Sequence, residues 1–247
     1  MSKNKEFRPA IVIPCYRHAS SLKSFLNQIL NYGYHVIIVD DGNEPSQANI
    51  LQELASLERV SIVVNKTNEG KGAAFLLGVS FASEHGFTHV LQIDADGQHD
   101  INSIPRFMHQ ASINPNKLIY GSPVYNNVPK GRYLARFITH FWVAVELGKM
   151  QIIDTMCGLR VYPIKPVLEI ANVRSIGKRM DFDTEIFIRM YWYGVDYISE
   201  PISVSYIENG VSNFAPFRDN VLISIMHTKL CCEKVLHFWS IHNRSYL

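Results

Sequence analysis

The chain has 247 residues, of which 47% are hydrophobic, and its 24 Lys and Arg residues nearly balance its 22 Asp and Glu residues. This length and composition indicate a folded protein with a substantial core rather than a disordered chain. A formal net charge of +2, without a long basic run, argues against a dedicated nucleic-acid-binding surface.

Short apolar runs alternate with helical patterns through the first half of the chain. The patterns predict buried strands at residues 10–14, 35–39, 60–64 and 90–93, with helices between them, including one at 70–83. Because these strands are apolar throughout, we expect an α/β fold with a mostly parallel central sheet flanked by helices.

The second half has a less regular pattern. Strands are predicted at 117–120 and 158–162, and extended chain at 198–206, interrupted by Pro201. Helices are predicted at 133–147, 182–193 and 217–239. No linker or repeat divides the chain, so we expect one unit. It comprises a half at about 8–121, a second half at 122–210 and an amphipathic helical tail at 211–247.

Nothing in the sequence indicates a membrane span or a secretion signal. No apolar stretch approaches the roughly 18 residues that a spanning helix needs, and the polar residues 1–8 lack the apolar core of a signal peptide. We therefore expect a cytoplasmic protein whose four cysteines stay reduced.

Acidic residues follow two of the predicted strands. Asp40 and Asp41 come after the second, and Asp94 and Asp96 after the fourth. Ligands of parallel sheets bind beyond the carboxyl ends of the strands. Two carboxylates two residues apart on a turn can face one Mg²⁺ or Mn²⁺, and Gln98 adds a neutral oxygen. A solvated acidic turn is the alternative.

Three further segments have both a functional and a purely structural interpretation. Asp40 and Asp41 can accept hydrogen bonds from a base or ribose, or can form a turn. Residues 68–74 come at the start of a predicted helix. Its free backbone N–H groups and Lys71 can bind an anion, or the segment is an ordinary glycine-rich turn. The carboxylates at 181–185 include a candidate general base, or form the acidic first turn that the helix dipole favours.

These motifs occur in a fixed order along the chain. They are Pro14-Cys15-Tyr16, Val39-Asp40-Asp41-Gly42, Asn68-Glu69-Gly70-Lys71-Gly72 and Gln92-Ile93-Asp94-Ala95-Asp96-Gly97-Gln98-His99, followed by Gly121-Ser122, Asp154-Thr155-Met156-Cys157-Gly158-Leu159-Arg160 and Phe182-Asp183-Thr184-Glu185. Over about residues 10–210 the set resembles the family 2 glycosyltransferases of the GT-A fold. It is most similar to the branch that transfers sugars to dolichyl or polyprenyl phosphate.

The resemblance implies a single GT-A domain with a nucleotide-binding half at about 8–121 and an acceptor half at 122–210. Such a domain would transfer one sugar, with inversion, from a nucleoside-diphosphate sugar. The acceptor would be one such as a lipid or polyprenyl phosphate, and the cofactor Mg²⁺ or Mn²⁺. The implied residues are Pro14, Tyr16, Asp40 or Asp41, Lys71 and Asp94 for the nucleotide, Asp94, Asp96 and Gln98 for the metal, Asp183 or Glu185 for the acidic group of the acceptor site, and Arg160 for phosphate.

Two departures from the family pattern concern cations. Arg17 and His18 stand where Asn-Glu is usual, so Arg17 is a further nucleotide-binding candidate that leaves the donor base open. Pro123 replaces the arginine of a Gly-Ser-Arg pattern. The candidates that would compensate for the missing cation are Lys130, Arg132 and Arg136.

The C-terminal tail combines apolar side chains such as Phe217 and Trp239 with basic ones such as Arg218 and Lys229. Such a helix either packs on its own domain or lies in the interface of a membrane, here at its cytoplasmic face. Two other functions stay open: a non-catalytic sugar-nucleotide-binding protein and a sugar nucleotidyltransferase. The glycine-rich phosphate loop of the latter is missing after the first predicted strand.

Overall fold

A seven-stranded sheet forms the centre of the described structure, with the strand order β3-β2-β1-β4-β6-β5-β7. The structure is a computed structural model that describes residues 6–124, 130–149, 153–203 and 215–240. The strands are β1 (Pro9–Cys15), β2 (His35–Asp41), β3 (Val60–Asn65), β4 (His89–Gln92), β5 (Leu118–Val124), β6 (Arg160–Pro163) and β7 (Tyr197–Ser203). Only β6 runs antiparallel to its neighbours among these strands, so the predicted mostly parallel sheet is confirmed.

Strand β1 shows why these strands are apolar along their whole length. Ala10 and Val12 face one hydrophobic cluster, while Ile11 and Ile13 face a second cluster on the other side of the sheet. All four side chains are fully buried. A strand covered on both faces therefore has no position left for a solvated residue.

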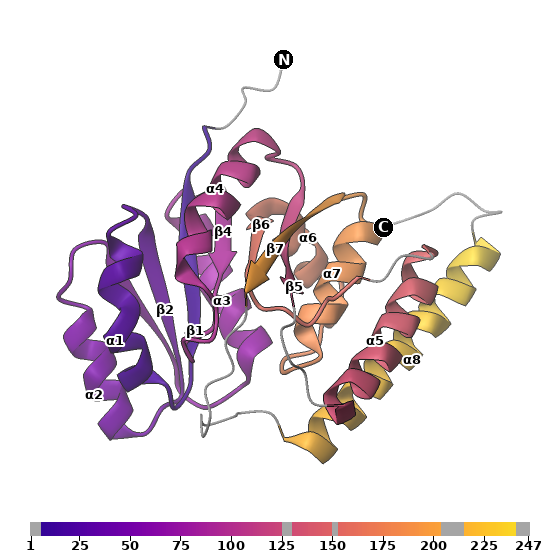
Figure 1. Cartoon of the computed structure of the whole chain (residues 1–247), viewed down its shortest axis with the longest axis horizontal. Helices are drawn as coiled ribbons and strands as arrows, with labels where there is room; N and C mark the ends of the chain where they lie inside the picture. The colour runs from indigo at the N-terminus through magenta and orange to yellow at the C-terminus, as the bar shows by residue number, and fades with distance from the viewer. Residues whose placement is uncertain (1–5, 125–129, 150–152, 204–214, 241–247) are drawn as a thin grey trace.

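Helices cover both faces of the sheet (Figure 1). One face carries α1 (Ala19–Leu30), α2 (Pro45–Leu54) and α4 (Ile104–Ile113). The 3₁₀ turn η1 (Ile101–Ser103) precedes α4. The other face carries α3 (Lys71–Glu84), α6 (Ile164–Val173) and α7 (Phe182–Trp192). Helices α5 (Lys130–Leu147) and α8 (Pro216–Ser240) lie side by side and pack against α7. No helix in the described ranges is both long and apolar enough to cross a bilayer.

The fold differs from the sequence expectation in two respects. Helices α4 and α6 were not predicted, although each buries an apolar face against the sheet. Strand β7 also continues through Pro201, which pairs with Ser122 of β5, so the predicted interruption was wrong. The proline is tolerated because β7 is the last strand of the sheet, where a missing N–H leaves no neighbour unpaired.

Candidate active site

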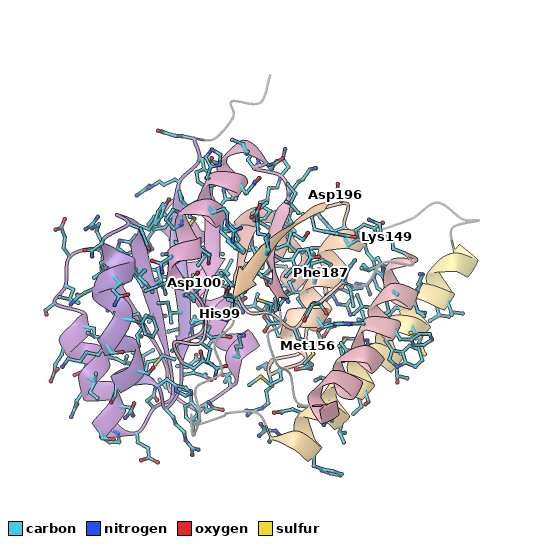
Figure 2. All side chains as sticks on the ribbon, viewed as in Figure 1. His99, Asp100, Lys149, Met156, Phe187 and Asp196 are labelled. Atoms are coloured by element: carbon cyan, nitrogen blue, oxygen red, sulfur yellow. The ribbon has the colours of Figure 1, made fainter. Side chains whose placement is uncertain are left out.

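A cavity of about 640 Å³ opens beyond the carboxyl ends of β1, β2 and β4. Figure 2 locates this part of the molecule by the labelled side chains of His99 and Met156. The lining includes most of the residues that the sequence predicted: Pro14, Tyr16, Arg17, Asp41, Lys71, Asp94, Asp96, Gln98 and Asp183. Parallel strands end at one edge of a sheet, which is why motifs far apart in the chain meet there.

Lys71 links two acidic residues at the base of this cavity. It is the first residue of α3, and its Nζ lies 2.7 Å from Asp94 Oδ1 and 2.8 Å from Asp183 Oδ2. Burial alone would lower the pKa of Lys71, but the two carboxylates outweigh it and raise that pKa. Burial likewise opposes ionisation of Asp94, yet Lys71 and His99 hold the pKa of Asp94 well below its usual range. Lys71 and Asp94 are therefore both charged at neutral pH.

The segment before β6 approaches this bridge very closely. A Cβ atom on Gly158 would lie 2.5 Å from Asp94 Oδ2 and 2.8 Å from Lys71 Nζ. Either distance is shorter than a real Cβ contact, so any side chain at this position would push the ion pair apart. Gly158 is thus needed for the loop to close over the Lys71–Asp94 pair.

Asp183 is held from below by two neighbouring strands. Gln92, at the end of β4, donates from Nε2 to Asp183 Oδ1 at 2.8 Å. Arg160 pairs with Gln92 across β4 and β6, and its guanidinium donates to the backbone carbonyl of Asp183. The carboxylate and the main chain of Asp183 are therefore both fixed at the first turn of α7.

Arg160 does not have the role that the sequence suggested. Its side chain is fully buried and donates to the carbonyl oxygens of Thr155, Cys157 and Asp183 and to the hydroxyl of Tyr162. The expectation that Arg160 approaches a phosphate is wrong in this structure, because its guanidinium donates to protein groups beneath the cavity.

Glu185 also lies away from the cavity. Its carboxylate is 2% exposed and lies 2.7 Å from the guanidinium of Arg189 and 3.3 Å from Nζ of Lys229. It also accepts a hydrogen bond from the backbone N–H of Gly177 at 2.7 Å. Of the two acidic candidates at the start of α7, only Asp183 lines the cavity.

Asp40 and Asp41 organise the loops around the β1–β2 end of the cavity. Asp40 accepts from the backbone and side-chain N–H groups of Asn43 at 2.9 and 2.8 Å. Asp41 accepts from the Asn68 side chain and from the backbone N–H of Gly70, each at 2.9 Å. Both carboxylates act as turn formers here, and Asp41 also contributes to the cavity lining.

Arg17 is presented to the cavity by an unusual backbone conformation. Its φ of +63° lies in the left-handed region, which costs a non-glycine residue about 1–2 kcal/mol. A hydrogen bond of 2.6 Å from its backbone N–H to Asn43 Oδ1 offsets part of this cost. The guanidinium lies 4.9 Å from the centre of the Tyr16 ring, which also lines the cavity.

Oxygen donors suited to a hard cation gather on the turn after β4. Asp94, Asp96 and Gln98 all line the cavity, and the Asp96 carboxylate accepts the backbone N–H of Gln98 at 3.0 Å. In the described ranges no three His, Cys, Asp or Glu side chains are grouped to hold a metal alone. Two carboxylates and an amide fit Mg²⁺ or Mn²⁺, which usually completes its shell with water and phosphate oxygens.

Several residues at the site carried no assigned role in the sequence. Arg179 and Arg218 bring two further cations to the cavity, and they come from segments without a recognisable motif. His99 lies within a motif, and its Nε2 is 3.2 Å from Asp94 Oδ2. The side chains of the predicted candidates Lys130, Arg132 and Arg136 lie outside the described part of the chain.

Comparison with known proteins identifies relatives of this site and fold. Residues 10–162 match the family Glycosyl transferase family 2. A UDP-N-acetylglucosamine–dolichyl-phosphate N-acetylglucosaminyltransferase of Methanococcus voltae is 25% identical over 197 residues, which cover 72% of this chain and 78% of that protein. Polyprenol monophosphomannose synthase of Mycolicibacterium smegmatis is 24% identical, covering 84% and 81%.

A solved structure shares the fold. Glucosyl-3-phosphoglycerate synthase of Mycobacterium tuberculosis, crystallised with Mn²⁺, UDP-glucose and phosphoglyceric acid, superposes with a TM-score of 0.64 at 12% identity. The match covers 91% of this chain and 79% of that one, and it shows the GT-A fold. The family match spans more than half of the chain and includes the strand ends that line the cavity. The chain therefore belongs to glycosyl transferase family 2, and it is a glycosyltransferase that takes its sugar from a nucleotide donor.

Proposed function

We propose that the protein transfers one sugar, with inversion, from a nucleoside-diphosphate sugar to a lipid phosphate. The proposal depends on one observation: Lys71, Asp94, Asp96, Gln98 and Asp183 line one cavity at the carboxyl edge of the sheet. Both relatives described above are named for polyprenyl-type phosphate acceptors, which supports this class of acceptor.

The nucleoside would lie at the β1–β2 end of the cavity. Pro14, Tyr16 and Arg17 line this end, and Asp41 holds the neighbouring loop. An aromatic ring and a guanidinium can stack on a base or contact a phosphate. Because Arg17 stands where the family pattern usually has Asn, we expect it to influence which base is accepted.

The metal would be held by Asp94, Asp96 and Gln98. A bound Mg²⁺ or Mn²⁺ would supply positive charge that stabilises the leaving nucleoside diphosphate. The glucosyl-3-phosphoglycerate synthase structure with Mn²⁺ and UDP-glucose supports a divalent ion in this fold. Lys71 and Arg179 add fixed cations at the same cavity, where they can bind phosphate oxygens.

The surroundings of Asp183 favour an acceptor that is already anionic. One carboxylate oxygen is bonded to Lys71 and the other to Gln92. These two donors occupy half of the four lone-pair sites of the carboxylate and fix its orientation, which leaves it fewer ways to take a proton from a hydroxyl. A phosphate oxygen needs no such base, so Asp183 would orient Lys71 and the acceptor.

The reaction is a single in-line displacement. An acceptor phosphate oxygen forms a new bond to the anomeric carbon from the face opposite the diphosphate. The bond from that carbon to the diphosphate oxygen breaks, and its electron pair leaves with the nucleoside diphosphate. No proton transfer is required when the acceptor oxygen carries a negative charge.

The test is transfer of labelled sugar from UDP-, GDP- and dTDP-sugars to a short-chain, water-soluble isoprenyl phosphate, with Mn²⁺ or with EDTA. We expect Asp96→Asn to lower kcat about a hundredfold or more. Asp100→Asn is the matched control, because Asp100 is a nearby acid that caps the 3₁₀ turn η1 and Asn caps equally well.

Two results would contradict the proposal. Transfer that continues unchanged in excess EDTA would exclude the metal role. Transfer to a sugar hydroxyl or another non-phosphate acceptor, with none to the isoprenyl phosphate from any donor, would exclude the acceptor class.

A further inference from the structure

We propose that the exposed faces of α5 and α8 form a surface that docks on an anionic phospholipid membrane and delivers the acceptor to the cavity. We call this the α5–α8 surface. The inference rests on the proposed lipid-phosphate acceptor. The surface carries apolar side chains on two adjacent helices, at the position where the active-site cavity meets α8.

Helix α8 presents an uncharged stripe to solvent. Phe217 is 86% exposed, Ile225 59% and Leu236 70%, and Val221 and Val235 are also exposed. Their spacing of about four, or of ten or eleven, residues places them on one face of the helix. An exposed helix face usually carries charged residues, so a stripe of large apolar side chains indicates a contact surface.

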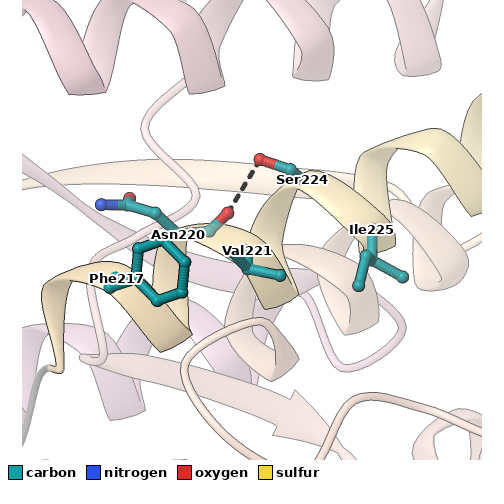
Figure 3. Close-up of a pocket in the computed structure, with 5 residues that line it drawn as sticks. All are labelled: Phe217, Asn220, Val221, Ser224 and Ile225. Atoms are coloured by element: carbon teal, nitrogen blue, oxygen red, sulfur yellow. Dashed lines mark hydrogen bonds between the residues drawn. The ribbon is translucent and has the colours of Figure 1, made fainter.

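The hydroxyl groups beside this stripe are already hydrogen-bonded within their own helix. Figure 3 shows Phe217, Asn220, Val221, Ser224 and Ile225 around a shallow hollow of about 570 Å³. Ser224 Oγ donates to the carbonyl of Asn220 at 2.8 Å, and Thr228 Oγ1 donates to the carbonyl of Ser224 at 2.8 Å. Removing water from these hydroxyls therefore costs less than it would for unpaired groups.

Helix α5 extends the apolar surface. Phe141 is 55% exposed, and Trp142 and Val145 are also exposed. Trp142 lies beside α8, with its ring centre 6.5 Å from that of His227. The two helices run side by side at the outer end of the molecule, away from the sheet (Figure 1). An amphipathic pair in this position can lie in the plane of a membrane interface.

The charges beside the stripe favour anionic lipid. Arg218, Lys229 and Lys234 lie on α8 next to the apolar residues, with the Arg218 side chain 51% and the Lys229 side chain 41% exposed. Arg218 lies 3.1 Å from Asp219 and Lys229 lies 3.3 Å from Glu185, but both carboxylates are buried, at 0% and 2% exposure, whereas the two basic side chains remain about half exposed. The basic partner of each pair is therefore the one that can reach lipid headgroups.

The stripe begins at the mouth of the active site. Ala215 and Arg218 line the cavity, while Phe217 between them points outward. When Phe217 and Ile225 lie in the membrane interface, the phosphate of a lipid in that membrane would therefore lie beside Arg218. This continuity favours a lipid surface over a second copy of the chain, which would have to lie against the same opening.

The experiment is co-sedimentation of the full chain with phosphatidylcholine vesicles, with and without phosphatidylglycerol. The variant is the double substitution Phe217→Gln and Ile225→Gln, at two exposed positions. The matched control is Val173→Gln, because Val173 is 62% exposed at the end of α6, outside the α5–α8 surface. Circular dichroism and thermal unfolding check that each variant is folded.

We expect the wild-type protein to sediment with anionic vesicles, the control to match it, and the double variant to bind about tenfold more weakly. Wild-type protein that stays in the supernatant, or a double variant that sediments equally well, would overturn the proposal. The proposal would also be overturned if light scattering showed that the wild-type protein is a dimer and that the double substitution makes it a monomer.

Transfer to the short-chain isoprenyl phosphate without vesicles is measured separately on the wild-type protein. If this transfer fails, the proposed acceptor is wrong whatever the vesicles show. If it succeeds while vesicle binding fails, only the docking surface is wrong.

Discussion

Replacing Lys71 with methionine should destabilise the protein far more than removal of an ordinary ion pair. The substitution keeps an unbranched apolar side chain and removes the ammonium group. That group lies 2.7 Å from Asp94 and 2.8 Å from Asp183, and its side chain is only 15% exposed. Two adjacent carboxylates would then face each other without a cation.

The size of the loss follows from these distances. At an effective dielectric constant of about 20, each contact corresponds to about 6 kcal/mol before the cost of burial is subtracted. Breaking a buried ion pair typically costs about 3–5 kcal/mol. Because 27% of the Asp94 side chain is exposed, we expect the lower end, about 3 kcal/mol. That is a large share of the 5–15 kcal/mol that usually separates folded and unfolded proteins.

Urea unfolding followed by circular dichroism measures this loss, as a midpoint lowered by about 1 M. The control is Lys178→Met, since Lys178 lies 2.8 Å from Glu69 with side chains 65% and 45% exposed. We expect that change to cost less than about 1 kcal/mol. Equal losses for the two variants would refute the reasoning.

The loss should also depend on pH in a defined direction. The pKa of Asp94 is depressed in the folded protein, so its contribution is present above the unfolded pKa of about 3.9. That contribution disappears as the pH falls below this value. The free energy of unfolding of Lys71→Met should therefore differ most from that of the wild-type protein between about pH 6 and 8. This difference should become smaller as the pH falls through about 4. A difference that is constant over this range would contradict the electrostatic explanation.

Three further predictions concern buried groups. Gln92→Leu removes the hydrogen bond to Asp183, and we expect kcat to fall about tenfold or more with little change in KM for the donor. An unchanged kcat would show that this bond has no positioning role. Burial raises the pKa of Glu146, which pairs with His227 at 2.8 Å, so stability is lost as the pH rises through that pKa. Glu146→Gln should therefore gain stability relative to the wild-type protein as the pH rises above the usual carboxyl pKa of about 4.3, and thermal unfolding that shows no such trend would contradict this. Burial also raises the pKa of Cys15 to about 12, so Ellman's reagent should label this thiol at pH 8 only after unfolding, and rapid native labelling would count against its burial.

The first half of the fold, about residues 8–121, was largely predictable because its signals are local. The strand β2 appears in the sequence as HVIIV, which leads directly into Asp40 and Asp41. An apolar run followed by turn-forming acids needs no distant partner to be recognised. The positions of Asp94 and Asp96 at the same edge then follow from the parallel arrangement of the strands.

The second half depends on long-range pairing that no local pattern contains. The chain leaves β5, forms α5 and returns as β6 between β4 and β5, in the reverse direction. Helix α4, in the first half, was also not predicted, although its apolar residues Ile104, Phe107, Met108 and Ala111 have a spacing that does indicate a helix. It was missed because the polar turn that precedes it resembles a loop, and Pro105 falls in its first turn.

Arg160 shows why the role of a basic residue depends on its tertiary surroundings. In the sequence it follows Gly158 and Leu159 and resembles a phosphate-binding cation. In the fold it pairs with Gln92 across two antiparallel strands, a register that only the reversed direction of β6 creates. That register places both side chains beneath Asp183, where the guanidinium donates only to neutral oxygen atoms. A buried cation with such partners can hold the main chain in place, so in the proposed function the phosphates would be bound by the cations that line the cavity.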